Sequence, residues 1–210
     1  PPGAPAGEQR VRILVLNTFG VFPPVSGGKK RIFHLYQALA RRADVTLLDL
    51  GVAGSAAELR EFGPHYREIR IAPDERFAAH EAALHRLLHQ SVADIAALLH
   101  AHEIAQLTSA MKELLAKSDV VVASHVYLYP LIERHWQGEL WYDAHNVEAD
   151  LKADILGVDR LAAPLPDPRD ADGAGGSVRL SLWNHPGDDI YGVFARSRRV
   201  VESVGQLLED

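Results

Sequence analysis

The sequence contains no cysteine among its 210 residues. That absence excludes disulfides, iron–sulfur clusters, thiolate zinc sites and a cysteine nucleophile. A long hydrophobic run is missing too, because the uncharged stretch from Ile13 to Gly28 is interrupted by three glycines and two prolines. No segment has the pattern of a secretory signal peptide. We therefore expect a cytoplasmic, globular protein without a membrane span.

An excess of positive charge is also absent. The chain has 22 Lys and Arg against 28 Asp and Glu, a formal net charge of −6 at pH 7. Proteins that hold nucleic acid through its phosphates present a basic face, so we expect no nucleic-acid partner. Hydrophobic residues make up 47% of the chain, which is enough for a substantial core.

Short apolar runs alternate with helical patterns over residues 11–157. Runs without helical period at 11–16, 45–50 and 119–124 predict buried strands, and weaker signals at 66–71 and 139–143 predict two more. Helices are predicted at 29–42, 56–62, 75–117 with a break near Ser91, 129–135 and 146–156. This alternation predicts an α/β fold, a Rossmann-like doubly wound parallel sheet.

The composition divides the chain into four parts. Residues 1–10 are rich in Pro, Gly and Ala and predict a flexible tail, and residues 11–157 form the Rossmann-like domain. Residues 158–188 hold clusters of Pro and Gly that indicate a linker or irregular segment. An apolar stripe over residues 189–210 predicts a terminal helix that packs on the domain.

In an open parallel sheet, ligands bind beyond the carboxyl ends of the strands. That rule selects three polar loops, which contain Asn17, Thr18 and Ser26, then Ser124, His125 and Tyr127, then Asp143, His145, Asn146 and Glu148.

The first loop ends in Gly27-Gly28 followed by Lys29, at the start of a predicted helix. Glycine there lets a ligand approach the backbone, and the helix N-terminus offers free amides and partial positive charge to a phosphate or a sugar hydroxyl. Alternatively, the glycines only make the turn and the basic residues are a solvated face. The pattern is neither GxGxxG nor a P-loop.

Asp143 and His145 follow the last predicted strand of the domain. Asp143 can orient an imidazole or bind a hydroxyl, and His145 can donate to a sugar oxygen or a phosphate. The alternative is that Asp143 or Asn146 caps the next helix. We favour the cap for Asn146 and a functional role for His145.

We predict no metal site. His80 and His85 are five residues apart, which places their imidazoles on different faces of a helix. His85 and His89 could share a metal, but no third ligand is evident and such an Ala-rich helix usually carries these residues on its surface. The sequence also lacks a GxSxG elbow.

Two segments together suggest a family. Residues 12–16, Phe22-Pro23-Pro24-Val25-Ser26-Gly27-Gly28 and the helix over 31–39 resemble the start of family 4 glycosyltransferases. Residues 142–148, with the sequence YDAHNVE, are similar to the YDxHNVE segment of one bacterial branch of that family. The resemblance covers residues 11–156 and does not clearly extend beyond them.

The resemblance implies a GT-B enzyme with two Rossmann-like domains, in which this N-terminal one binds the acceptor. It implies retention of anomeric configuration, a UDP- or GDP-linked sugar as donor, a sugar or glycan as acceptor, and no cofactor or bound metal. It also implies site residues. His145 and Asp143 would be catalytic, and the substrate-binding residues would be Gly27, Gly28, Lys29, Ser124, His125 and Asn146.

The sequence departs from the family in one respect. The paired-glutamate motif of the C-terminal donor-binding domain is absent, so that half is expected to be missing and transfer by this chain alone to be weak or nil. A non-catalytic glycan- or protein-binding module and a small Rossmann-like hydrolase are the alternatives. Basic residues at 29–31 and 41–42 hint at peripheral contact with the inner membrane face, although a solvated helix face is the simpler view.

Overall fold

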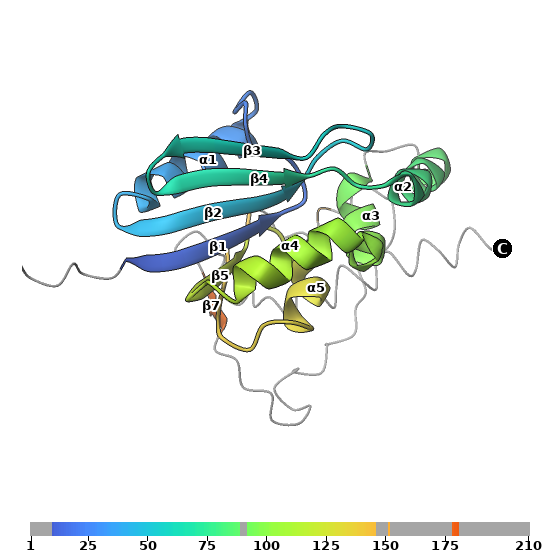
Figure 1. The fold of residues 1–210 in the computed structure, drawn as a ribbon. Coiled ribbons are helices and arrows are strands. Elements are labelled where there is room, and N and C mark those ends of the chain that lie inside the picture. The colour runs from blue at the N-terminus through green and yellow to red at the C-terminus, as the bar shows by residue number, and fades with distance from the viewer. Residues whose placement is uncertain (1–9, 89–91, 146–150, 152–177, 181–210) are drawn as a thin grey trace, which may run out of the picture.

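The structure is a computed structural model that describes residues 10–88, 92–145, 151 and 178–180. In these residues seven strands form one sheet in the order β3-β4-β2-β1-β5-β6-β7 (Figure 1). The strands are β1 Val11–Asn17, β2 Ala43–Leu50, β3 Glu58–Gly63, β4 Tyr66–Ile71, β5 Val120–Ala123, β6 Glu139–Tyr142 and β7 Val178–Leu180.

All neighbouring strands in this sheet pair in parallel except β3 and β4, which form an antiparallel pair. Without β3, the parallel strands read third, second, first, fourth, fifth, sixth in chain order. This is the strand order of the Rossmann fold, and it confirms the predicted fold class. Successive strands are added on one side of β1 up to β4 and on its other side from β5 onward. The point between β1 and β5 is therefore the topological switch point, where such folds bind ligands.

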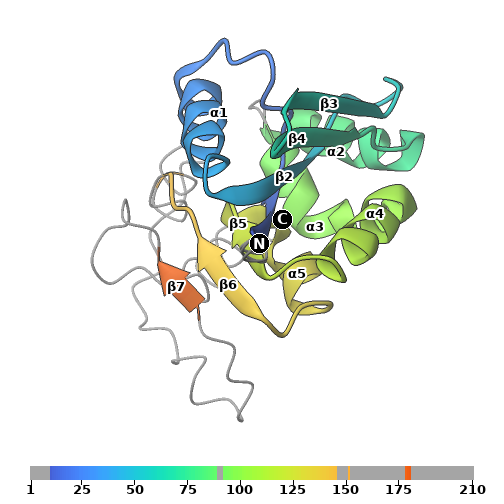
Figure 2. The ribbon, with the colours of Figure 1, turned by 60° about the vertical axis from the view of Figure 1, so that its left-hand side comes forward.

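Helices cover both faces of the sheet (Figure 2). Of the described helices, α1 (Gly27–Leu39) lies on one side, and those of the other side are α2 (Glu75–Leu88), α3 (Ala93–His100), α4 (Ala105–Leu115) and α5 (Tyr129–Glu133). Two 3-10 turns lie on that second side: η1 (Ala101–Glu103) connects α3 to α4, and η2 (Val126–Leu128) leads from β5 into α5. None of the described helices is long and apolar enough to cross a membrane.

Side chains of β1 alternate between two hydrophobic cores. Ile13 and Val15 pack with Ile32 of α1, whereas Leu14 and Leu16 belong to the core under α3 and α4. Because successive strand residues point to opposite faces, both sets are apolar and the strand reads as one continuous hydrophobic run. This explains why the central strands were visible in the sequence.

The helix predicted at 56–62 is wrong, since these residues contribute β3 instead. Exposure alternates residue by residue along β3, as expected for an edge strand with one covered face. Gly63, with φ +158°, precedes Pro64 in the turn that leads back into β4. Ala56 and Ala57 favoured a helix in composition, but pairing with β4 decides the outcome.

Helix boundaries also differ from the predictions. α1 begins at Gly27 rather than Lys29, with Ser26 as N-cap, and ends at Leu39 rather than near Arg42. The predicted segment 75–117 divides into α2, α3 and α4, and its break falls where expected, although Ser91 itself lies outside the described residues.

The sheet also contains a strand that the sequence did not predict. Residues 178–180, within the predicted linker 158–188, pair in parallel with β6. At the other end of the domain, Arg10 anchors the start of β1 by donating to the carbonyl oxygens of Ala40 and Ala43. The tail over 1–9, the rest of the linker and the predicted helices at 146–156 and 189–210 lie outside the described residues, apart from Leu151.

Candidate functional site

Three polar residues meet where β1, β5 and β6 end. Asn17, Ser124 and Asp143 are all buried, at 0%, 0% and 2% exposure. The amide of Ser124 donates to the carbonyl of Leu16, and the amide of Asp143 donates to that of Ala123. The sheet ladder therefore continues one residue past β5 and β6, and all three residues lie at the carboxyl ends of neighbouring strands at the switch point.

Asp143 is held by two side chains of α1. Arg31 makes a bidentate ion pair with it, with Nη2 at 2.6 Å from Oδ1 and Nη1 at 3.2 Å from Oδ2. The hydroxyl of Tyr36 donates to Oδ2 at 3.1 Å, and burial followed by the charge of Asp143 raises the Tyr36 pKa well above its usual value. Asp143 thus orients Arg31 and is not positioned as a free base.

His145 lies against this ion pair. Its Nε2 is 3.1 Å from Nη1 of Arg31, 3.3 Å from Oγ of Ser124 and 3.7 Å from Oδ2 of Asp143. Nδ1 of the same ring lies 3.4 Å from Nη1 of Arg31, so the guanidinium approaches both ring nitrogens. The ring of His125 stacks on that of His145 with centroids 4.2 Å apart.

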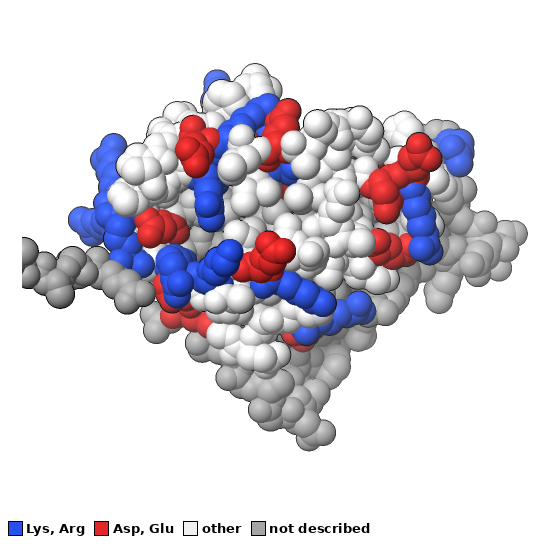
Figure 3. Space-filling view, viewed as in Figure 1, with Lys and Arg blue, Asp and Glu red and all other residues white. Residues whose placement is uncertain are grey.

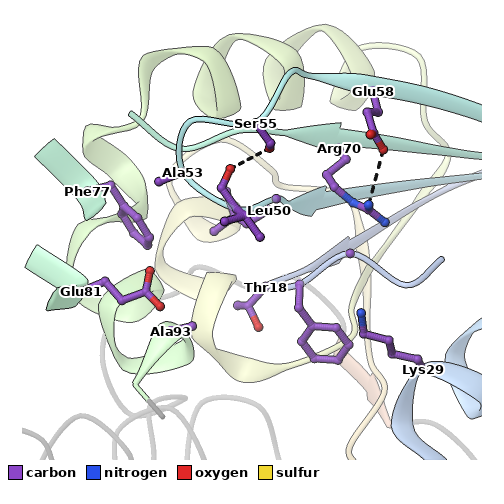
Figure 4. Close-up of a pocket in the computed structure, with 14 residues that line it drawn as sticks. Thr18, Lys29, Leu50, Ala53, Ser55, Glu58, Arg70, Phe77, Glu81 and Ala93 are labelled. Carbon is purple, nitrogen blue, oxygen red and sulfur yellow. Dashed lines mark hydrogen bonds and ion pairs between the residues drawn. The ribbon is translucent and has the colours of Figure 1, made fainter. Parts of the chain in front are cut away.

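A pocket of about 420 Å³ opens beside this cluster, beyond the ends of β1, β2 and β4 (Figure 4). Phe77 and Glu81 of α2 form one side of it, opposite Lys29 and Arg70. Phe19 connects the pocket to the cluster, because it lines the pocket and its ring lies 5.5 Å from that of His125. The remaining lining includes Thr18, Gly20, Leu50, Gly51, Val52, Ala53, Ser55, Glu58 and Ala93.

The loop that leads from β1 to α1 is fastened to β4. Oε1 of Glu68 accepts the amides of Val21 and Phe22 at 2.6 and 3.0 Å. Arg70 bridges the same elements, since its Nη2 donates to the carbonyl of Phe22 at 2.8 Å and to Glu68 at 2.9 Å. This network fixes the loop that carries Phe19 at the mouth of the pocket.

A buried carboxyl pair completes that network. Burial, then hydrogen bonding with Glu68, raises the pKa of Asp49 to about 9. Burial alone would raise the pKa of Glu68, but hydrogen bonds from Asp49 and from the amides of Phe22 and Val21 lower it overall. The pair therefore holds one proton at neutral pH, which resides on Asp49.

The glycines around the site serve two purposes. A Cβ on Gly20 would lie 2.2 Å from the Arg70 guanidinium, so a larger residue there would displace that group from its bonds to Glu68 and Phe22. A Cβ on Gly27 or Gly28 would meet nothing within 4 Å, and neither residue has a positive φ. Both glycines are exposed in the first turn of α1, so nothing packed against them requires glycine and their backbone is uncovered.

The structure brings together four predicted site residues, Asp143, His145, Ser124 and His125, from two loops. Lys29 lines the adjoining pocket instead. Gly27 and Gly28 are exposed in the first turn of α1. Asn146 and Glu148 lie outside the described residues, so the predicted helix cap is not described.

Sequence reasoning missed Arg31 and Tyr36 as site residues. The available signal was the place of Asp143 directly after a predicted strand, because a carboxylate buried at such a position requires a cationic or donor partner. Because Arg31 pairs with Asp143, it does not contribute to the basic face suggested for residues 29–31. On the surface shown in Figure 3, basic and acidic side chains are interspersed.

No protein-family model and no curated protein matches the sequence. Among solved structures, the chain is similar to sucrose-phosphate synthase from Thermosynechococcus elongatus, at 14% identity and a TM-score of 0.38, over 94% of this chain and 97% of that one. It is also similar to trehalose-phosphate synthase from E. coli bound with UDP-2-fluoro glucose, at 12% identity and a TM-score of 0.38, over 62% and 32%.

A third similar structure is a UDP-glycosyltransferase in complex with UDP, at 14% identity and a TM-score of 0.39, over 70% of this chain and 31% of that one. All three neighbours are GT-B glycosyltransferases. The chain spans about a third of the length of the E. coli protein and of the UDP-glycosyltransferase.

Proposed function

We propose that this chain is the acceptor-side domain of a retaining GT-B glycosyltransferase of family 4. The full enzyme would move a sugar from a UDP- or GDP-linked donor to a hydroxyl of a sugar or glycan acceptor. The observation that carries the proposal is the cluster of Arg31, Asp143, His145 and Ser124 at the switch point, which adjoins a pocket of about 420 Å³.

The pocket suits a sugar or a sugar phosphate. Phe19 and Phe77 offer apolar surface for the face of a sugar ring, and Thr18 and Ser55 offer hydroxyls. Lys29 and Arg70 add positive charge on one side of the pocket. Arg70 already binds Asp49 and Glu68, so Lys29 is the cation that we assign to an acceptor phosphate.

The cluster suits the reacting end of the acceptor. Arg31 contacts His145 through Nη1, and Asp143 fixes the guanidinium through its ion pair. As the nucleoside diphosphate leaves, negative charge develops, and the open amides of Gly27 and Gly28 at the start of α1 would stabilise it. His145 would contact the transferred sugar. Asp143 would act through Arg31, as a positioning residue.

The donor-binding domain is the partner that this proposal requires. Without it, donor positioning and part of the charge stabilisation are missing, so we expect weak or no transfer by this chain alone.

A second candidate is a non-catalytic module that binds a glycan or a protein. One observation favours it, namely that Asp143 is fully engaged by Arg31 and Tyr36 and so does not serve as a free general base. Both candidates use the same pocket, and they differ in whether a donor-binding partner exists.

Calorimetric titration tests the proposal. Neutral hexoses, hexose phosphates, a UDP-sugar and a GDP-sugar are titrated into the chain and into the Lys29→Ala variant, with Lys30→Ala as the matched control because Lys30 is exposed. We expect a hexose or hexose phosphate to bind, with affinity reduced in Lys29→Ala and retained in Lys30→Ala.

Titration with the nucleotide sugars tests whether the donor is bound by this chain or by a separate donor-binding domain. The proposal expects them to bind weakly to this chain, and weak binding directs the search to a donor-binding partner. Strong binding of a UDP- or GDP-sugar that is lost in His145→Ala and kept in His135→Ala would contradict the proposed division of labour, since His135 is exposed and away from the cluster.

A further inference from the structure

A second polar cluster lies outside the candidate acceptor site, where α2 meets the end of α3. His80 of α2, His100 at the end of α3 and Glu103 of η1 each offer one ligand atom, and these atoms all lie within 4.8 Å of one another. Nδ1 of His100 is 2.9 Å from Oε1 of Glu103, and Nε2 of His80 is 3.7 Å from Oε2. The two imidazoles stack in parallel, with centroids 3.8 Å apart.

One atom of this cluster, Nε2 of His80, is closed off from solvent and has no hydrogen-bond partner among the described residues. It lies 3.7 Å from Oε2 of Glu103, which is too long for a hydrogen bond, and Nη2 of Arg76 holds that oxygen in an ion pair at 2.9 Å. Buried polar atoms are normally satisfied, so a nitrogen left open toward a carboxylate indicates that a further species belongs between them.

The ligand atoms of this cluster indicate which kind of ion would bind between them. Two imidazoles and one carboxylate suit Zn²⁺ and related transition metals, whereas Ca²⁺ and Mg²⁺ prefer oxygen ligands. Two His and one Glu are also a known three-ligand set for zinc, with the fourth position left to water. The sequence contains no cysteine that would offer a softer ligand.

We propose that His80, His100 and Glu103 bind a Zn²⁺ ion that fastens α2 to the α3–η1 segment. Zinc bonds of about 2.0–2.1 Å require ligand atoms closer together than 4.8 Å, so the stacked rings must tilt toward the ion. Arg76 must also release Oε2 of Glu103, which its Nη2 approaches to 2.9 Å. The Arg76 side chain is 72% exposed and moves into water easily.

The site would influence the pocket through α2. Phe77 and Glu81, which form one side of the pocket, lie within one helical turn of His80. A bound ion would hold that wall in place without contacting an acceptor. The proposal is independent of the glycosyltransferase assignment, because it concerns only how α2 is attached.

Zinc titration of the chelator-treated chain tests this site. We expect one tight equivalent of Zn²⁺, no comparable binding of Mg²⁺, and a raised melting temperature with zinc. In His80→Ala, His100→Ala and Glu103→Gln, affinity should fall at least about tenfold. The matched control His85→Ala removes an exposed histidine of the same helix and should leave affinity unchanged.

Other outcomes would overturn the proposal. If His85→Ala or His145→Ala lowers zinc affinity as much as His80→Ala, the ion binds elsewhere among the 11 histidines. If the cluster variants melt earlier without metal but keep the affinity of the parent chain, the cluster is only a hydrogen-bond network between helices. Glu103→Gln keeps the shape of the side chain, so its circular dichroism confirms that the fold is intact when affinity is read.

Discussion

Two charged networks lie toward the carboxyl ends of the strands, and they differ in the groups that they bind. The β4 network of Asp49, Glu68 and Arg70 closes on backbone, because Glu68 accepts two amides of the loop after β1. The switch-point network of Arg31, Tyr36 and Asp143 closes on side chains and continues to His145. The first network fixes a loop and places Arg70 in the lining of the pocket, whereas the second presents polar side chains at the switch point.

This difference shows why burial and charge alone do not identify a functional site. Glu68 and Asp143 are equally buried carboxylates that each bind an arginine. Only the second lies at the point where the strand order reverses, with two stacked histidines beside it. Position in the topology separates a structural anchor from a candidate site.

Removing the loop anchor should give the largest effect on stability. Glu68→Ala leaves Arg70 and the amides of Val21 and Phe22 without their acceptor, so we expect a loss of about 3–5 kcal/mol in the free energy of unfolding. Urea denaturation measures it. The control Glu61→Ala, at an exposed position on β3, should change stability little. If Glu68→Ala lowers the free energy of unfolding no more than Glu61→Ala does, the loop is held by other contacts.

The two kinds of glycine should respond in opposite directions. Gly20→Ala forces a Cβ against the Arg70 guanidinium, and we expect a loss of about 1–3 kcal/mol from overpacking. Gly28→Ala meets open space in a helix and should leave stability equal or improve it by up to about 1 kcal/mol. Thermal melts report both. Equal destabilisation by the two substitutions would contradict the proposed openness of the backbone at Gly28.

The carboxyl pair should make stability depend on pH. Because the Asp49 pKa is raised to about 9 in the folded state, the folded chain binds more protons than the unfolded chain between the ordinary Asp pKa and 9. Its contribution is therefore complete at low pH and is lost as pH rises toward 9.

Asp49→Asn should remove this dependence while keeping a neutral donor for Glu68. At pH 8 we expect the variant to exceed the parent chain in free energy of unfolding by about 1 kcal/mol or more. The difference should shrink toward pH 4. Denaturation at several pH values measures it, and a gap that widens on acidification would place the proton elsewhere.

The last comparison is between two buried tyrosines. Tyr36→Phe removes a hydrogen bond to the charged Asp143, for which we expect a loss of about 1.5–3 kcal/mol. Tyr66→Phe removes a longer bond, 3.3 Å, to the carbonyl of Phe33 and should cost less. Unfolding free energies that rank the other way would show that Arg31 alone satisfies Asp143.

Much of the fold was predictable because the central strands are buried on both faces. The apolar runs of β1, β2 and β5 and the alternation with helices were sufficient for the Rossmann-like class. The edge strand β3 was not, because half of its side chains are exposed and its two preceding alanines favour a helix. The short β7 lies in a segment of linker-like composition, where pairing with β6 decides.

Part of the site was predictable from the rule that ligands bind beyond the carboxyl ends of parallel strands. That rule selected Ser124, His125, Asp143 and His145, which the structure places together. It did not select Arg31 or Tyr36, because both come from a helix face that only the tertiary packing turns toward Asp143. The histidine and glutamate cluster was missed for the same reason, since its residues come from three different elements.

The most direct test of the acceptor-side assignment is an NMR titration of the isotope-labelled chain with hexose phosphates and with UDP- and GDP-sugars. We expect a hexose phosphate to shift the signals of Thr18, Lys29, Ser124 and His145, and the nucleotide sugars to leave them almost unchanged. Shifts of the His145 and Gly28 signals by a nucleotide sugar, with none by any hexose phosphate, would contradict it and assign donor binding to this chain.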